Sequence, residues 1–356
     1  MAVPAIVAVD LILTYDCNCR CPYCFIKDRG DKLSMSPETL DRILDWIAMH
    51  SAETVEVILL GGEPTLMPHL IERAVYRASR WQRMAGKQIR FNMTTNALNI
   101  DEPLAKNLAR WGIRYLLSID GTGTRHNKSR PAVNIADPFA HLENRFAMLK
   151  AYQPHMAGRM TIVPKNVEWL AEDLDKLYHM GFESFIISPA TGMTWSPEKL
   201  DTFVEQMIDF ASRRTPDRYG ALQPRMDPID GDAVGRGTWG CSAGRGRVSI
   251  DPRGMIFGCA RMTRLDADDG LYLGNIETGI DPNGNILKFQ DDTYSSRPVE
   301  CIECELREQC IGGCPSVNYD ATGSLVTPAP DECRVARAFD HIRRESQRRA
   351  QSLRAS

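Results

Sequence analysis

The stretch Cys17-Asn18-Cys19-Arg20-Cys21-Pro22-Tyr23-Cys24-Phe25 sets Cys17, Cys21 and Cys24 at a C-x3-C-x2-C spacing. It follows residues 7–13, an apolar run that we expect to form a buried strand. Three thiolates on one short loop can hold three irons of a cubane cluster, which leaves the fourth iron without a protein ligand. Cys19 adds a fourth thiol on the same loop, so a four-cysteine zinc site is the alternative.

The 356-residue chain contains eleven cysteines in two groups, with none between Cys24 and Cys241. It has no signal-peptide pattern at its start and no apolar run long enough to span a bilayer, so we expect a cytoplasmic protein without a membrane partner. In cytoplasmic proteins, cysteines that are grouped in sequence bind metal or take part in catalysis more often than they form disulfides. A net charge of -3 and a pI of about 6.2 give no electrostatic reason to expect nucleic acid as a partner.

Short β-like runs and helical patterns alternate along the first part of the chain. Ser36 and Pro37 open the first helical pattern, as N-cap and first-turn residues. The other expected strands are 55–60, 89–94, 115–119, 160–163 and 185–188, and the other expected helices are 69–81, 104–111, 139–152, 167–179 and 197–210. Roughly six βα units predict an α/β fold with a partial (β/α)6 TIM-like barrel. Functional residues of such folds gather where strands end.

The sequence changes character after residue 214. Residues 215–240 are rich in Gly, Pro and Asp and are expected to bridge two parts of the molecule. We therefore divide the chain into a barrel (1–214), a bridging region (215–240), a loop-rich cysteine domain (241–338) and a C-terminal helix or tail (339–356). Metal sites could supply the stability that the glycine-rich third part lacks. The basic tail is expected to be a solvated surface helix.

The string Gly61-Gly62-Glu63-Pro64 follows the second expected strand. Glycines there let the backbone approach a ligand closely, and a carboxylate accepts hydrogen bonds from an ammonium group. Alone, the string is also compatible with an ordinary turn. Further polar strand ends are Thr95-Asn96, Ser118-Ile119-Asp120-Gly121 and the nearby His126-Asn127-x-x-Arg130.

Taken together, the cysteine loop, the Gly-Gly-Glu-Pro string and these strand ends resemble the signature of radical S-adenosylmethionine (SAM) enzymes. In that family the open iron takes the amino and carboxylate groups of SAM, and the Gly-Gly-Glu-Pro residues bind the amino group. The resemblance implies that Tyr23 and Val163 lie near the adenine, Asn96 near the ribose, and Ser118 and Arg130 at the carboxylate, which suits an arginine fork. Cys19 occupies a position that the family does not use as a ligand.

The second cysteine group reads Cys241-x12-Gly254-x4-Cys259, then Cys301-x2-Cys304-x5-Cys310-x3-Cys314, then Cys333. This pattern resembles the SPASM domain, an extension of radical SAM enzymes that mostly modify peptides. The resemblance implies one 4Fe–4S cluster on Cys301, Cys304, Cys310 and Cys333, and another on Cys241, Cys259 and Cys314. The chain offers no obvious fourth thiolate for the latter, so that site is open or is filled by water, a carboxylate or a substrate thiolate. Two zinc sites of a ribbon type are the structural alternative.

The resemblance implies SAM and three 4Fe–4S clusters as cofactors. A reductant such as flavodoxin or ferredoxin would supply the electron that cleaves SAM, and the 5′-deoxyadenosyl radical would take a hydrogen atom from a substrate carbon. An auxiliary cluster would accept the electron when the substrate radical is oxidised. The fold would supply orientation and exclusion of water. No general base stands out in the sequence.

The string Cys241-Ser242-Ala243-Gly244 resembles one common in maturases that crosslink ribosomally made peptides. We therefore expect a precursor peptide or protein as substrate and a carbon–carbon or thioether link as product. The alternative is an anaerobic sulfatase maturase, which makes formylglycine. That enzyme carries an extra cysteine and an Asp directly after the second SPASM cysteine, whereas Cys259 is followed by Ala260-Arg261.

Sixteen residues precede Cys17, so we expect no winged-helix leader-binding domain ahead of the barrel. Leader recognition would then need a separate leader-binding protein or the barrel surface. Two alternatives come from other classes, an iron–sulfur electron carrier without SAM chemistry and a zinc-stabilised binding module. The Gly-Gly-Glu-Pro string and the βα layout count against the carrier, because it needs no large substrate barrel.

Overall fold

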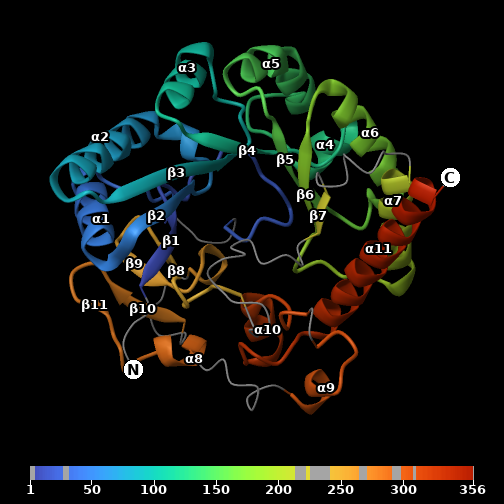
Figure 1. Cartoon of the computed structure of the whole chain (residues 1–356). Helices are drawn as coiled ribbons and strands as arrows, with labels where there is room; N and C mark the ends of the chain where they lie inside the picture. The colour runs from blue at the N-terminus through green and yellow to red at the C-terminus, as the bar shows by residue number, and fades with distance from the viewer. Residues whose placement is uncertain are drawn as a thin grey trace.

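A computed structural model describes residues 5–26, 32–212, 222–224, 241–263, 271–290, 298–307 and 310–355. Its first half alternates strands and helices, with the helices outside the curved sheet (Figure 1). The parallel strands of this half are β1 (Ile6–Ile12), β2 (Ser51–Leu60), β3 (Gln88–Thr95), β4 (Arg114–Ser118), β5 (Ala157–Ile162) and β6 (Ser184–Pro189). The predicted α/β fold with an open, partial barrel is confirmed.

The helices between these strands begin where local signals predict. The Ser36 hydroxyl accepts a hydrogen bond from the Thr39 N–H at 3.1 Å, and Asp101 caps α3 in the same way at 2.9 Å. One short helix, α4, was expected only as a polar motif. The helices of this half are α1 (Pro37–His50), α2 (Pro68–Ala85), α3 (Glu102–Arg110), α4 (Gly123–Ser129), α5 (Pro138–Tyr152), α6 (Leu170–Met180) and α7 (Pro197–Ser212).

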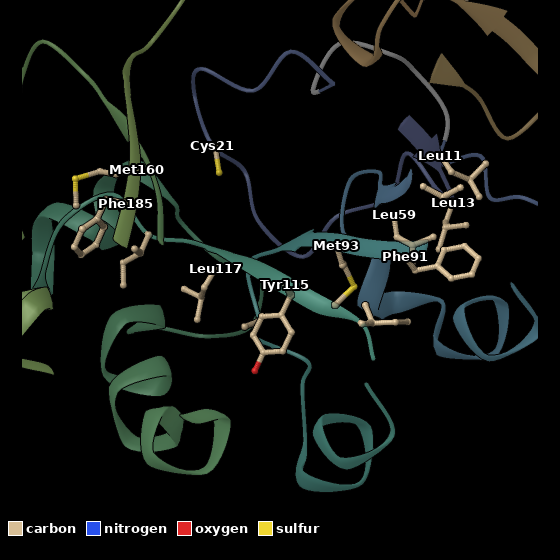
Figure 2. Packing of buried hydrophobic residues seen from close by; sticks show 14 of the residues in the cluster. Leu11, Leu13, Cys21, Leu59, Phe91, Met93, Tyr115, Leu117, Met160 and Phe185 are labelled. Carbon is tan, nitrogen blue, oxygen red and sulfur yellow. The ribbon is translucent and has the colours of Figure 1, made fainter. Parts of the chain in front are cut away.

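Alternation along the strands separates an apolar outer face from a more polar inner face. On β1, Val9 and Leu11 are fully buried in the core between sheet and helices, and the core continues through the side chains shown in Figure 2. Asp10, between them, points to the other face and pairs with Arg247 at 2.6 Å. The inner side of β1 therefore carries an ion pair that joins it to the neighbouring strand.

The cysteine-rich region extends the sheet of the barrel, which the sequence did not predict. β8 (Arg247–Ile250) pairs in parallel with β1 and continues through β9 (Met255–Phe257), β10 (Tyr272–Asn275) and β11 (Gly279–Ile280). Within the described residues, the sheet runs β11-β10-β9-β8-β1-β2-β3-β4-β5-β6-β7. β7 (Leu222–Pro224) falls in the expected bridging region, of which residues 215–221 and 225–240 lie outside the described residues. The domain boundaries remain predictions.

The C-terminal helix differs from the expected solvated tail. α11 (Pro330–Ala355) begins before residue 339 and packs one face against α7, where the Phe339 and Phe203 rings lie 5.6 Å apart at their centroids. Phe339 is 2% exposed, because it packs against α7. Short helices α8 (Ile286–Gln290), α9 (Val299–Ile302) and α10 (Pro315–Thr322) precede it. Across the described part of the chain, no helix has the length and apolar character that a membrane crossing requires.

Candidate iron–sulfur and SAM site

The first cysteine group lies on the loop that leaves β1. The Cys17 N–H donates to the Asp16 carboxylate at 2.9 Å, and the Cys19 N–H donates to the Cys17 sulfur at 3.3 Å. Cys21 is buried, whereas Cys17 and Cys24 are half-buried. The backbone of the loop thus already supports one of the three predicted ligands through an N–H···S bond, a contact typical of iron–sulfur sites.

The segment that follows α4 holds the outer side of this loop. The Arg20 N–H donates to the Pro131 carbonyl at 2.8 Å, and the Val133 N–H donates to the Asn18 carbonyl at 2.7 Å. Cys19 forms an isolated antiparallel bridge with Ala132 between these two bonds. The loop is therefore fixed by main-chain contacts to a segment more than one hundred residues away in sequence.

The glycines of the Gly-Gly-Glu-Pro string allow a close approach of two backbone segments. The approached segment is residues 14–16 of the same chain and not a ligand. The Gly62 N–H donates to the Thr14 carbonyl at 2.7 Å, and the Glu63 N–H donates to the Asp16 carbonyl at 2.9 Å. A Cβ atom on Gly62 would lie 2.0 Å from the Asp16 oxygen. The two glycines thus allow the end of β2 to support the entrance of the cysteine loop, while Pro64 begins a short 3-10 turn (Pro64–Leu66).

The Glu63 carboxylate joins the ends of β2 and β3. Its oxygens accept bonds from the hydroxyls of Thr65 and Thr95, each at 2.6 Å, and from the N–H groups of Thr65 at 3.0 Å and Asn96 at 2.7 Å. Burial raises the pKa of the Glu63 carboxyl, and these donors oppose the shift. The Asn96 amide in turn donates to Asn18 at 2.6 Å and to the Cys19 sulfur at 3.4 Å. Glu63 and Asn96 therefore meet at the cysteine loop, and their predicted contacts to SAM remain predictions.

Arg130 lies beside the loop but already has an acidic partner. Its Nε is 2.8 Å from the carboxylate of Asp120, and its Nη1 is 4.0 Å from the Cys21 sulfur. Asp120 is 3% exposed and also accepts bonds from the Tyr23 hydroxyl and, at 2.8 Å, from the Thr161 N–H. Sequence reasoning placed Asp120 in a motif without giving it a role; its only signal was a carboxylate at a strand end.

The remaining predicted SAM contacts also lie at strand ends. Ser118 ends β4 and Val163 directly follows β5, and each is 7% exposed. Tyr23 lies under the Arg130 guanidinium, whose carbon is 5.7 Å from the ring centroid. The structure thus gathers the predicted residues around one end of the sheet, while their contacts to SAM remain predictions.

The thiols of the loop differ in acidity. A hydrogen bond from Cys19, opposed by burial and helped by the Arg130 charge, lowers the pKa of Cys21 to about 7. A bond from Cys19 also lowers the pKa of Cys17. Donation to these two sulfurs raises the pKa of Cys19 itself. The shifts thus set Cys19 apart from Cys17 and Cys21, and its place outside the ligand set remains a prediction.

The seven C-terminal cysteines form two groups in space. Burial first, and then the charges of Cys314 and Cys241, raise the pKa of Cys259 to about 12. Burial, and then the charges of the other three members, raise the pKa of Cys301 to about 11, in a group that holds Cys301, Cys304, Cys310 and Cys333. The neighbours of Cys259 and Cys301 thus belong to the two sets that the resemblance implies, and the sets as cluster ligands remain predictions.

The described residues contain no three His, Cys, Asp or Glu side chains that converge as the ligands of one metal ion would. A cubane cluster does not need this convergence, because each thiolate binds a different iron. The three iron–sulfur clusters and the zinc alternatives therefore both remain predictions.

The residues after Cys259 lie against the first cysteine loop. Ala260 packs with Ile12, Tyr15 and Ile26 in one small apolar cluster. Arg261 lies over the ring of Phe25, with its guanidinium carbon 5.2 Å from the centroid. The structure therefore brings the loop of one predicted auxiliary site next to the loop of the first.

Residues 11–177 match the Radical SAM superfamily model, from within β1 to within α6. The chain carries a radical SAM domain. The predicted resemblance to radical SAM proteins with a C-terminal SPASM domain is confirmed. This fold implies SAM and a 4Fe–4S cluster as cofactors.

Relatives of the chain include two maturation or biosynthetic enzymes. The chain is 22% identical to the radical SAM cyclopropyl synthase TigE of Paramaledivibacter caminithermalis over 338 residues, or 86% of this chain and 67% of the relative. It is 27% identical to a cysteine-type anaerobic sulfatase-maturating enzyme of Clostridium perfringens over 333 residues, or 84% of this chain and 85% of the relative.

The solved structure of anSMEcpe with bound AdoMet and the Kp18Cys peptide matches the chain with a TM-score of 0.76. The match has 18% identity and covers 98% of this chain and 99% of that chain. The likeness therefore extends over the cysteine-rich part as well as the barrel and shows a shared fold.

Proposed function

We propose that this protein is a maturase that crosslinks a ribosomally made peptide through radical SAM chemistry, with Cys17, Cys21 and Cys24 as ligands of the SAM-binding cluster. The observation that carries the proposal is the meeting of the cysteine loop, the Glu63–Asn96 junction and the segment after Cys259 at one end of the sheet. Held by Cys17, Cys21 and Cys24, such a cluster would supply the electron for reductive cleavage of SAM and so for hydrogen abstraction from the substrate.

On the SAM side, the protein would act by fixing its own loop. Glu63 accepts four hydrogen bonds from the ends of its own turn and of β3, so it anchors the edge at which the amino group of SAM would bind. Arg130 would share its guanidinium between Asp120 and the SAM carboxylate, and five N–H donors make this sharing feasible. Tyr23 would cover the adenine from the same side.

On the substrate side, Cys241, Cys259 and Cys314 would hold a cluster that takes up the electron released when the substrate radical is oxidised. The contact of Ala260 with Ile12 and Ile26 supports this role, because it places that site next to the first loop. Cys301, Cys304, Cys310 and Cys333 would hold the third cluster and pass the electron outward to an acceptor. A flavodoxin or ferredoxin in the cytoplasm would supply electrons to the first cluster.

Formylglycine formation in a sulfatase is the second candidate. The sulfatase-maturating enzyme of Clostridium perfringens supports this candidate, because the match covers 85% of the length of that enzyme. Against it, the residue directly after Cys259 is Ala260, which lies in an apolar cluster where the sulfatase maturases would carry an acidic base. The peptide-bound structure of anSMEcpe supports a peptide or protein substrate in either case.

The first test is iron and sulfide content after anaerobic reconstitution, with 5′-deoxyadenosine release measured on the same sample with dithionite and SAM. Three 4Fe–4S clusters give about twelve iron per chain. The variant with Cys17, Cys21 and Cys24 changed to Ala should lose about four iron and all deoxyadenosine. Zinc in place of iron, or iron without SAM cleavage, would contradict the proposal.

Mass spectrometry of peptides encoded near the gene then separates the two products. A crosslink removes two hydrogens and leaves the sulfur of a cysteine in the peptide. Formylglycine formation from cysteine replaces the sulfur by oxygen and creates an aldehyde that hydrazides capture. The crosslink proposal fails if the protein converts a sulfatase peptide to the aldehyde and leaves precursor peptides unchanged.

A further inference from the structure

The two predicted auxiliary sites share a short loop. Cys310 and Cys314 lie on it, yet Cys310 belongs to the group of Cys333 and Cys314 belongs to the group of Cys259. Cys333 comes from the first turns of α11, which Figure 1 shows beside α10. Any contact between this loop and α11 therefore bears on both sites at once.

Glu332 makes such a contact from the position next to Cys333. Its carboxylate accepts the Cys314 N–H at 2.8 Å, and the two residues are eighteen apart in sequence. Gly313 permits the approach, because a Cβ atom there would lie 2.8 Å from the Glu332 Cβ and would need its φ of +79°. A negative charge is thus held between a residue of one cysteine group and a residue of the other.

Asn318 of α10 holds the same two segments together. It is 1% exposed, and its amide donates to the Gly312 carbonyl at 2.8 Å while its oxygen accepts the Ala329 N–H at 2.9 Å. The Ala329 carbonyl then accepts the Glu332 N–H at 3.0 Å. Glu332 is therefore set in place from both ends, by its own main chain and by its bond to Cys314.

We propose that Glu332 is a positioning residue that links the two auxiliary iron–sulfur sites and lowers the reduction potential of the cluster held by Cys314. This inference rests on the proposed function, since it takes both cysteine groups as cluster ligands. The potential of an iron–sulfur cluster depends on net charge and on hydrogen bonds near its thiolates. The Glu332 carboxylate adds negative charge near the cluster and also takes up the N–H of the ligand Cys314. Both effects favour the oxidised cluster.

The test compares Glu332→Gln with Asp331→Asn. Gln keeps an oxygen that can accept the Cys314 N–H but removes the charge. Asp331 is the matched control, because it precedes Glu332 directly, pairs with Arg334 and has a side chain 43% exposed. Redox titrations of the reconstituted proteins, followed by electron paramagnetic resonance, give the midpoint potential of each cluster, and iron content is measured on the same samples.

In Glu332→Gln, the midpoint potential of the cluster held by Cys314 should rise. If the bond to Cys314 also fails, about four iron should be lost, which supports the positioning role. Asp331→Asn should match the wild-type protein in both measurements. The inference is overturned if Glu332→Gln keeps the wild-type iron content and all wild-type potentials. It is also overturned if both variants shift by the same amount.

A second variant keeps the inference testable. Asn318→Ala should lose iron from the two C-terminal sites while the first cluster still cleaves SAM, because only the shared loop and the start of α11 are released. The wild-type iron content distinguishes the two levels of failure. If the wild-type protein binds no iron at the C-terminal cysteines, the proposed function fails with this inference. If it binds about twelve iron and Glu332→Gln changes nothing, only the role of Glu332 is wrong.

Discussion

Gly62→Ala should detach the cysteine loop from the end of β2. The added Cβ would meet Asp16 oxygen at 2.0 Å, Asp16 carbon at 2.4 Å and the Tyr15 oxygen at 2.8 Å. All three atoms belong to the backbone, so no side chain can rotate away to make room. The clash lies at the two bonds that join the loop to the end of β2, from the Gly62 N–H to Thr14 and from the Glu63 N–H to Asp16.

The magnitude follows from these contacts. Forcing a methyl group into a filled site costs about 1–3 kcal/mol. Loss of two hydrogen bonds adds about 0.5–1.5 kcal/mol each. Together these terms destabilise the folded cysteine loop by about 2–6 kcal/mol. Because the loop can unfold locally, the first cluster should be lost before the barrel unfolds.

The assay is iron content and deoxyadenosine release of the reconstituted variant, with urea unfolding of the apoprotein to measure stability. Gly86→Ala is the matched control, because its Cβ would meet no atom within 4 Å, although its φ of +68° carries the cost of a left-handed residue. We expect Gly62→Ala to lose about four iron and SAM cleavage, and Gly86→Ala to keep both. Wild-type iron and activity in Gly62→Ala would refute the argument.

Three further predictions concern the same end of the sheet. Asp120→Asn should cost about 3–5 kcal/mol in urea unfolding, because it leaves the buried Arg130 without its anion, and should weaken SAM binding in calorimetry; unchanged stability and affinity would show that the pair is dispensable. Burial lowers the pKa of the His126 imidazole from 6.5 to about 3 in the folded protein. Between these pH values the unfolded chain binds one proton more than the folded chain, so the free energy of unfolding should fall by up to about 5 kcal/mol as the pH drops from 6.5 to 3. The same pH dependence in His126→Gln would contradict this. Cys19→Ser should keep the iron of the first cluster, whereas Cys17→Ser should lose it; equal iron loss would make Cys19 a ligand.

The sequence predicted most of the barrel because its signals are local. The cap at Ser36 and the apolar run at residues 7–13 each act over a few positions, and the structure confirms the helix and strand that they predict. The exceptions also have physical reasons. The helix α4 is seven residues long, too short for a visible hydrophobic period, and β8 has four residues whose pairing with β1 depends on the whole fold.

The predicted site shows the same division. Spacing singled out Cys17, Cys21 and Cys24, which lie on one loop and are close in sequence. The division of the seven C-terminal cysteines into two sets came from the SPASM resemblance. The pairing of Arg130 with Asp120 and the contact of Glu332 with Cys314 were not predicted. Each joins two turns of chain whose separation in space no local pattern encodes.

By itself, the sequence determined the α/β order and the radical SAM and SPASM resemblance, and the membership of the cysteine groups is a prediction that this resemblance implies. Only the tertiary structure decided what surrounds them. It set β8 beside β1, turned Gly62 toward the backbone of Asp16, and brought Ala260 against Ile12. Spacing and periodicity are properties of neighbouring residues. These contacts form only when segments distant in sequence pack together, because burial and hydrogen bonding over the whole fold offset the entropy lost on closing the loops between them.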